Sequence, residues 1–190
     1  MRMNTFDDAR LANLLGAVAT GVMDRVGAAC AEAAQLSGAG PEALIVMLDF
    51  SPEGSVHTLS QAVGLTHSGA VRLVDRLAKA GWVTRRAGDD ARSVKIGLTR
   101  RGRTVAERVR ARRNEELAKA LDGLTPRQRN DLLHTCELVV ANLTLQRLAQ
   151  RAAGALPAGG ALCRMCDFAA CGRPSGRCPA AREAARTIHG

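Results

Sequence analysis

Aromatic residues are scarce in this chain of 190 residues, which has three Phe, one Trp and no Tyr. Single-strand readers such as RRM and OB folds stack bases on aromatic rings, so the shortage argues against them. No apolar run approaches the about 18 residues that span a bilayer. The start, Met1 to Asp8, also lacks the apolar core of a signal peptide. We therefore expect a cytoplasmic protein with no membrane partner.

Familiar catalytic motifs are absent as well. The sequence holds no GxGxxG, GxxxxGK[ST], HExxH or GxSxG pattern, and these patterns mark dinucleotide, P-loop, zinc-protease and hydrolase sites. Their absence argues against an enzyme. Disorder is excluded too, because apolar residues make up 46% of the chain and recur with helical spacing.

Positive charge is concentrated in one segment. The net charge of the chain is +9, and residues 72–113 hold fourteen Lys or Arg against four acids, a net charge of +10. The remainder, with thirteen bases and fourteen acids, is close to neutral. A solvated face is the alternative interpretation, but it would not leave the rest of the chain neutral. The segment predicts a polyanion-binding surface, with nucleic acid as the leading candidate.

A helix–turn–helix followed by a hairpin is predicted around this segment. Thr58 to Gln61 has capping-box spacing, which starts a first helix that Gly64 ends. Thr66 caps a second helix that Gly81 ends. Residues 82–86 and 94–98 then predict two strands around a polar turn. This order of elements is typical of a winged helix.

Further helices flank the winged helix. Residues 1–36 predict one long helix, whose three glycines weaken it in isolation and so favour a closely packed partner. Residues 43–50 predict a short helix after Pro41. After the hairpin, Thr99 caps one helix and Thr125 opens another with a capping box. The second of these helices carries a predicted apolar stripe at Leu132, Leu133, Cys136, Val139, Val140 and Leu143.

Residues between about 58 and 104 resemble the MarR family of bacterial winged-helix transcription regulators. The likeness lies in an ordered set of short pieces with matching spacing: Leu59–Leu65, Arg72–Leu77, Gly81-Trp82-Val83, Asp90–Ser93, Leu98-Thr99 and Gly102. Flanking helices extend it to roughly residues 6–152, and nothing in it covers 161–190.

This resemblance implies a mainly α (α+β) fold in which the N- and C-terminal helices of two chains intertwine as a homodimer. It implies binding to a palindromic DNA operator, more often as a repressor. The second helix of the motif would enter the major groove and the wing tip would lie at the minor groove. The residues that would face DNA are Thr66, His67, Ser68, Arg72 and Arg76, with Arg92 as the wing arginine.

Arginine suits these positions because its planar fork binds guanine edges and phosphates, and narrow minor grooves attract it. Gly69, Ala70 and Val71 depart from the family pattern, so base recognition would depend on fewer polar contacts. We expect Arg72→Ala to reduce specificity and Arg92→Ala to reduce overall affinity.

The predicted organisation has five parts. They are an N-terminal dimerisation helix (1–40), a winged helix-turn-helix domain (41–103), C-terminal dimerisation helices (104–153), a linker (154–160) and a small cysteine-rich module (161–190).

Four of the six cysteines lie in that last module, at Cys163, Cys166, Cys171 and Cys178. The spacing C-x2-C-x4-C-x6-C is typical of a four-thiolate metal site. The module has few large apolar residues and cannot build a core of its own, so it needs a cross-link. The other two, Cys30 and Cys136, are expected to be buried structural residues on helices.

Three interpretations of the four cysteines compete. Disulfides are disfavoured because the chain lacks an export signal and cytosolic thiols stay reduced. A structural zinc ion fits the spacing. An iron–sulfur cluster is slightly favoured, because no His is among the ligands and Pro179 follows Cys178. The tail is also similar to that of a MerR-type superoxide sensor, with different cysteine spacing.

The leading hypothesis is therefore a DNA-binding regulator that responds to redox state or iron through one cluster per chain. A second hypothesis is a regulator that responds to a small-molecule effector and carries a structural zinc tail, which the MarR resemblance permits. A third, from another class, is an electron-transfer or enzyme-associated metalloprotein in which the cysteine module carries the activity.

Overall fold

The computed structural model describes residues 5–88, 94–154 and 159–189. The chain is mainly helical, with one two-stranded antiparallel sheet. In chain order the elements are α1 (Thr5–Ala34), α2 (Gly40–Ile45), the π-helical turn η1 (Val46–Phe50), α3 (Val56–Val63), α4 (His67–Lys79), β1 (Val83–Ala87), β2 (Val94–Leu98), α5 (Arg100–Ala120), α6 (Pro126–Ala152), the 3-10 turns η2 (Leu162–Met165) and η3 (Arg173–Ser175), and α7 (Pro179–His189).

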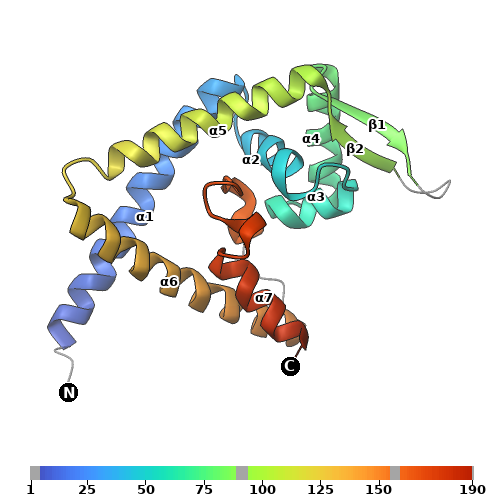
Figure 1. The fold of residues 1–190 in the computed structure, drawn as a ribbon. Coiled ribbons are helices and arrows are strands. Elements are labelled where there is room, and N and C mark those ends of the chain that lie inside the picture. Colours follow the sequence, from blue (N-terminus) through green and yellow to red (C-terminus); the bar gives the residue numbers. More distant parts are fainter. Residues whose placement is uncertain (1–4, 89–93, 155–158, 190) are drawn as a thin grey trace.

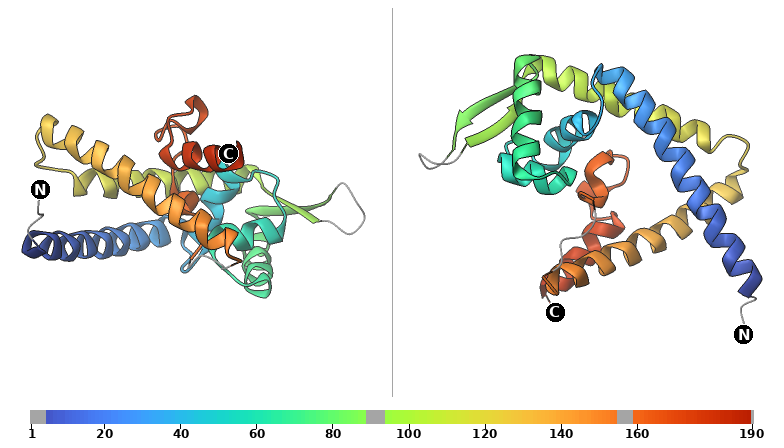
Figure 2. Two further views of the ribbon diagram at one scale, coloured as in Figure 1. Left: turned by 90° about the horizontal axis from the view of Figure 1, so that it is seen from below. Right: turned by 180° about the vertical axis from the view of Figure 1, so that it is seen from behind.

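Three regions can be distinguished in Figure 1. The head comprises residues 40–98, from α2 to β2. The stem comprises the long helices α1, α5 and α6. The tail module comprises residues 159–189, and it lies in the angle between the head and α6 (Figures 1 and 2).

The stem is held by packing between α1 and α5. Cys30 of α1 is buried, and its thiol donates a hydrogen bond to the carbonyl oxygen of Val109 at 3.8 Å. Nearer the far end, the Arg25 guanidinium pairs with the Glu116 carboxylate at 2.8 Å. The two helices thus form one stable unit from which the head extends.

Much of the remaining apolar surface of the stem is exposed. Most of the predicted stripe of α6 and the first half of α1 is exposed in the single chain, although Val139 and Val140 are half-buried. Cys136 is exposed, contrary to the expectation of a buried residue. The exposed large side chains on these helices are Leu11, Leu14, Leu15, Val18, Met23, Leu132, Leu133, Leu138, Leu143 and Leu145.

The composition of helix α1 must be compared with the expectation that the protein has no membrane partner. Its stretch Asp7–Ala34 is long and apolar enough to cross a membrane by length and composition, although no uninterrupted apolar run of that length exists. Charged residues such as Asp24 and Arg25 interrupt this stretch, and for that reason the sequence analysis predicted no membrane-spanning segment. The core helix of a soluble protein and a signal sequence near the N-terminus pass the same test, so this feature alone is weak evidence for a membrane.

The core of the head is built from α2, α3, α4 and β2. Its fully buried side chains are Leu44, Ile45, Leu59, Leu73, Leu77 and Ile96. The start of α3 differs from the prediction, because Ser55 and not Thr58 is the N-cap. The Ser55 hydroxyl accepts the Thr58 N–H at 3.1 Å, so the helix begins three residues earlier, at Val56.

The short helix predicted at 43–50 also begins earlier and changes character. Pro41 lies in its first turn at the start of α2, as expected, but residues from Val46 to Phe50 continue as a π-helical turn. This turn brings Phe50 to the edge of the head that faces the tail module, where its ring meets that of Phe168.

The wing forms as predicted, with a shift of one residue in β1. The strands pair antiparallel from Val83 opposite Leu98 to Ala87 opposite Val94. Ile96 is buried beneath the hairpin, and its N–H donates to the Gly54 carbonyl oxygen at 2.8 Å. The turn was predicted at residues 87–91, and its residues from Asp89 onward lie outside the described residues.

The residues around Gly81 that match the MarR pattern pack together at one site. Gly81 has a φ of 73°, a left-handed conformation that favours glycine after a helix end. Thr99 caps α5 and its hydroxyl also donates to the Gly81 carbonyl oxygen at 2.8 Å. Gly102 lies so close to the Trp82 carbonyl that a side chain would not fit. These residues therefore fix the junction of α4, the wing and α5.

Candidate nucleic-acid interface and cysteine cluster

The turn between α3 and α4 sets the exposed end of α4. Gly64 ends α3 with a φ of 73°, and Thr66 caps α4 by accepting the Gly69 N–H at 3.1 Å. The Thr66 and Ser68 hydroxyls lie 3.3 Å apart and both residues are exposed. The predicted cap is thus confirmed, and the first turn of α4 presents these hydroxyls beside exposed His67.

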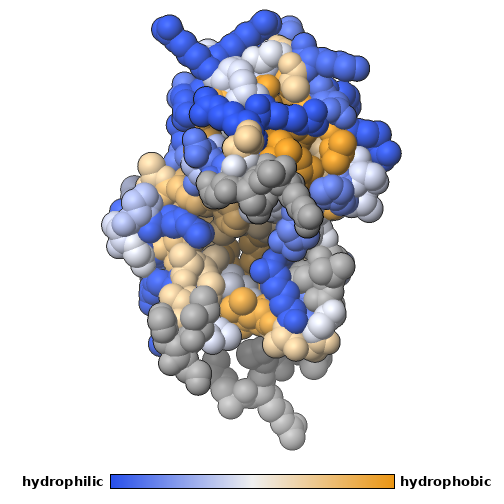
Figure 3. All heavy atoms as spheres, turned by 90° about the vertical axis from the view of Figure 1, so that its right-hand side faces the viewer, coloured by the Kyte–Doolittle hydropathy of each residue, from blue (hydrophilic) through white to orange (hydrophobic). Residues whose placement is uncertain are grey.

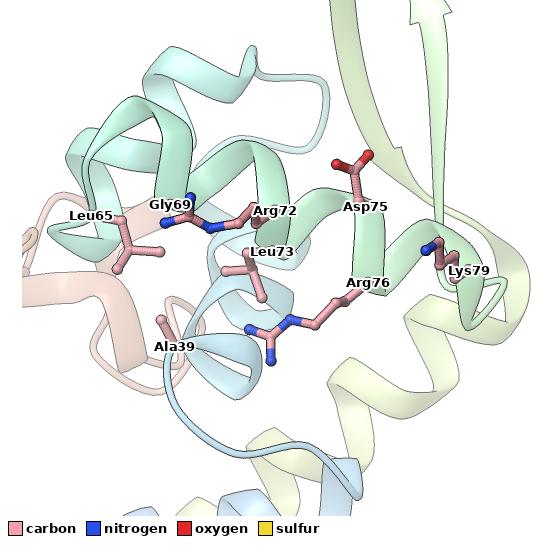
Figure 4. A pocket seen from close by; sticks show the side chains of 8 residues that line it. All are labelled: Ala39, Leu65, Gly69, Arg72, Leu73, Asp75, Arg76 and Lys79. Carbon is pink, nitrogen blue, oxygen red and sulfur yellow. The ribbon is translucent and has the colours of Figure 1, made fainter.

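The helix α4 separates apolar and basic side chains onto different faces. It buries Ala70, Leu73, Val74 and Leu77, whereas Arg72, Arg76 and Lys79 are exposed. Figure 4 shows the Arg72 and Arg76 side chains extending from one side of α4, near Leu65, Leu73 and Ala39. With Lys79 they line an open hollow of about 550 Å³. Such a surface suits an anionic partner broader than a small molecule.

Five of the six predicted DNA-facing residues therefore lie on the exposed part of α4. The sixth, Arg92, lies outside the described residues. Asp75, between the two arginines in sequence, points to another side of the helix in Figure 4 and pairs with Arg85 of β1 at 2.7 Å. Asp75 also lines the hollow, but its carboxylate pairs with Arg85 and so offsets little of the positive charge of Arg72 and Arg76.

A second basic area lies beside the hairpin and was not singled out from the sequence. Arg86, Lys95 and Arg103 line an open hollow of about 460 Å³ next to the strands. Their only sequence signal was membership of the basic segment. Figure 3, viewed from the hairpin side, shows hydrophilic side chains gathered over this upper end of the molecule.

Two of the four tail cysteines form a neighbouring thiol pair. Cys163 and Cys166 lie close enough for each thiol to shift the pKa of the other, and the Cys171 thiol donates a hydrogen bond to the Phe168 carbonyl oxygen at 3.5 Å. Left-handed Gly172 and Gly176, with φ values of 69° and 70°, bend the loop between the third and fourth cysteine. The four residues that the spacing grouped therefore lie in one small folded module.

The pKa values of the Cys163 and Cys166 thiols are shifted in opposite directions. The neighbouring Cys163 thiol lowers the pKa of Cys166 to about 6, and the nearby Arg113 and Arg173 guanidiniums act in the same direction. The Cys166 thiol, together with burial, raises the pKa of Cys163. A thiolate is therefore favoured at Cys166, and the thiolate is the form that binds metals.

The four thiols are not arranged as a complete metal site. Among the described residues, no group of three or more His, Cys, Asp or Glu side chains is placed so that it could hold a metal ion. The donor set nevertheless fits the chemistry of a four-thiolate site, because residues 163–178 hold four Cys and no His, and their one carboxylate, Asp167, contacts Asn114 and Arg110. Metal binding by these residues stays a prediction.

Comparison with known proteins gives one family and several structures. Residues 43–93 match the sequence model of the MarR family. Comparison with curated proteins gives no match. A MarR family protein from Bacillus stearothermophilus is 27% identical, with a TM-score of 0.57, and the match covers 80% of this chain and 99% of that chain.

Two further structures share the fold at lower identity. YusO from Bacillus subtilis has a TM-score of 0.60 at 18% identity, and the match covers 73% of this chain and 98% of that one. The organohalide-sensing regulator RdhR-CbdbA1625, solved with bound 2,4-dichlorophenol, has a TM-score of 0.52 at 20% identity, covering 78% and 86%. The matched family consists of transcriptional regulators and not enzymes. Residues 43–93 are therefore similar to the MarR family of transcriptional regulators, and the chain shares the winged-helix fold of these solved structures.

Proposed function

We propose that this protein is a cytoplasmic, homodimeric DNA-binding repressor that recognises a palindromic operator. The observation that carries the proposal is the exposed basic face of α4, where Arg72 and Arg76 stand beside the capped helix start and next to the wing. A helix of this kind enters the major groove with its N-terminal residues at the base edges. The net charge of +10 over residues 72–113 supplies attraction to phosphates.

Dimer formation is supported by the uncovered apolar face of the stem. Leu14 and Leu15 on α1 are 52% and 55% exposed, and Leu133 on α6 is 59% exposed. Contiguous apolar surface of this kind marks an interface. A second copy of the chain is the natural partner, since MarR regulators act as dimers. The apolar composition of α1 then needs no membrane.

The dimer can be tested by light scattering after size-exclusion chromatography. Leu133→Glu should give a monomer, because a charge would be buried in the interface, and it should lose operator binding. Gln150→Glu, at an exposed polar position of the same helix, is the matched control and should remain a dimer. A monomeric wild type that binds the operator normally would contradict the proposal.

Operator binding can be tested by a mobility shift on the DNA upstream of the chain's own gene. We expect a shift that a scrambled duplex does not give and that Arg72→Ala weakens. Transcription from that DNA should fall when the protein is present. Increased transcription would show an activator, and equal binding to both duplexes would leave no operator recognition.

We also propose that Cys163, Cys166, Cys171 and Cys178 hold a metal centre. The spacing of the four cysteines and the lowered pKa of Cys166 support this assignment, because a metal ion binds the thiolate form of cysteine. Zinc would cross-link the tail module, whereas an iron–sulfur cluster would add sensitivity to redox state and iron. Anaerobic protein should contain one centre per chain, and its absorption spectrum and metal content distinguish the two. Cys178→Ala should lose the centre and Cys136→Ala should keep it.

A small-molecule effector is a second candidate, favoured by one cavity. A pocket of about 190 Å³ lies between α6, α7 and the head, lined largely by apolar atoms and by Phe50, Leu148, Arg147 and Arg173. A related fold, RdhR-CbdbA1625, was solved with a chlorophenol bound. If the pocket binds an effector, then Leu148→Trp should abolish ligand-induced release of DNA without changing DNA affinity in its absence.

A further inference from the structure

The tail module is attached to the head and the stem at its entry. The Ala161 N–H donates to the Ala62 carbonyl oxygen at the end of α3, at 2.7 Å. The Arg147 guanidinium of α6 donates to the Gly160 carbonyl oxygen at 2.5 Å. Gly160 lies so close to the backbone of Ala62 and Val63 that a side chain would not fit. The module is therefore not the separate appendage that the sequence suggested.

Side chains between the cysteines make the main contacts with the head. Phe168, between Cys166 and Cys171, meets Phe50 of η1 edge to face, with ring centroids 6.0 Å apart. The Arg173 guanidinium lies over both rings, 4.6 Å from the Phe168 centroid and 5.7 Å from the Phe50 centroid. Half of the few aromatic residues in the chain are used in this one contact.

A largely buried ion pair adds to it. Arg164, between Cys163 and Cys166, pairs through Nε with the Glu42 carboxylate of α2 at 2.9 Å. Both side chains are about three-quarters buried, being 25% and 23% exposed. A pair with this burial holds its geometry better than a surface pair, and removal of one partner leaves the other charge poorly solvated.

Contacts on the stem side come from α5. The Asn114 amide donates to the Asp167 carboxylate at 3.1 Å. Arg110 pairs with Asp49 of η1 at 3.1 Å and reaches Asp167 at 4.0 Å. Arg110 thus joins head, stem and tail module at one point.

From these contacts we propose that the four-cysteine site controls the position of the DNA-binding head relative to the stem. The docking residues Arg164, Asp167 and Phe168 lie within the loops that the cysteines delimit, and Arg173 follows Cys171 by two residues. Closing or opening the thiol cluster must move these residues, and they contact α2, η1 and α5 directly. In a dimer, the head position sets the spacing of the two α4 helices, on which operator affinity depends.

This inference rests on the proposed metal centre, and it couples the metal-bound and metal-free states of that centre to operator affinity. The test uses full-length protein, loaded with its metal and then made metal-free with a chelator. Operator affinity is measured in both states by fluorescence anisotropy, and metal content is measured in every sample. We expect the two states of the wild type to differ at least about fivefold in Kd, the lower range of typical allosteric coupling.

Glu42→Gln and Phe50→Leu remove the head side of the contacts and leave every cysteine in place. Both should keep full metal content and lose the difference in Kd between the two states. Arg182→Ala, at an exposed position of α7, is the matched control within the module and should keep the difference. Hydrogen exchange of residues 43–50 should be faster in metal-free wild type than in loaded wild type, and equal in both states of Phe50→Leu.

The outcomes separate the inference from the function on which it rests. A wild type that binds metal but shows one Kd in both states overturns the inference and leaves the metal centre intact. So does an undiminished Kd difference in both head-side variants. Protein that binds DNA but takes up neither zinc nor reconstituted iron and sulfide overturns the metal centre and the inference together, while the regulator assignment stands.

Discussion

The roles of Arg72 and Arg76 on α4 lead to a quantitative prediction. The helix begins at His67 after the Thr66 cap. With a rise of 1.5 Å per residue, Arg72 lies about 8 Å and Arg76 about 14 Å along the helix from its first residue. The major groove is about 8.5 Å deep. A helix that enters by its N-terminus therefore brings Arg72 to the base edges and leaves Arg76 at the level of the phosphates.

The two substitutions should differ in kind. A bidentate contact from arginine to a base contributes about 1–3 kcal/mol of discrimination. A dimer reads two half-sites, so Arg72→Ala should lose about 2–6 kcal/mol, which is about 30-fold to 20,000-fold in the specific-to-nonspecific ratio. Each phosphate contact contributes about 0.9 to the salt slope, so Arg76→Ala should make that slope shallower by about 2 per dimer.

The assay is fluorescence anisotropy with operator and scrambled duplexes, between about 50 and 200 mM salt. Arg85→Ala is the matched control, because it removes the same charge from a residue already paired with Asp75. Arg85→Ala should leave both the specific-to-nonspecific ratio and the salt slope nearly unchanged. The reasoning is refuted if Arg72→Ala weakens both duplexes equally and flattens the salt dependence, since Arg72 would then be a phosphate contact.

Three further predictions concern the scaffold. Gly102→Ala should lower stability by about 1–3 kcal/mol in urea melts, because its side chain would meet the Trp82 carbonyl; unchanged stability would contradict this packing. Hydrogen bonds from Lys119 and Arg25 lower the pKa of Glu116 below its usual 4.5. The ionised Glu116 carboxylate therefore stabilises the folded chain above pH 4.5, and this stabilisation is lost as the pH falls through the lowered pKa. Glu116→Gln should therefore reduce the loss of stability in acid, and an identical pH profile would count against it. Burial raises the pKa of the Cys30 thiol, so Cys30 should resist iodoacetamide until unfolding, as peptide mass mapping can show; rapid labelling of the native protein would disprove its burial.

Local signals in the sequence predicted most of the head. The caps at Thr66, Thr99 and Thr125 all formed as expected, because each cap depends on hydrogen bonds within three residues. The cap of α3 was wrong, since Ser55 and Thr58 both carry suitable hydroxyls and propensity alone does not choose between them. The switch from α2 to a π-helical turn before Phe50 carried no recognisable local signal.

Exposure along the stem was harder to predict. Periodicity correctly marked an apolar stripe on α6, but it could not say whether the same chain or a second copy covers it. Cys136 illustrates this, because it lies on the stripe and is exposed in the single chain. The helix α7 was also missed, since proline and glycine near Cys178 favoured a loop and its helical pattern is short.

Local sequence patterns were enough to predict the winged helix, the basic segment and the grouping of four cysteines, because each depends on residues near one another in the chain. The docking of the tail module is visible only in the folded chain. Phe50 and Phe168, or Glu42 and Arg164, are far apart in sequence, and nothing in either local pattern indicates the other. Their contact depends on the path of α5 and α6, which returns the chain from the wing to the head.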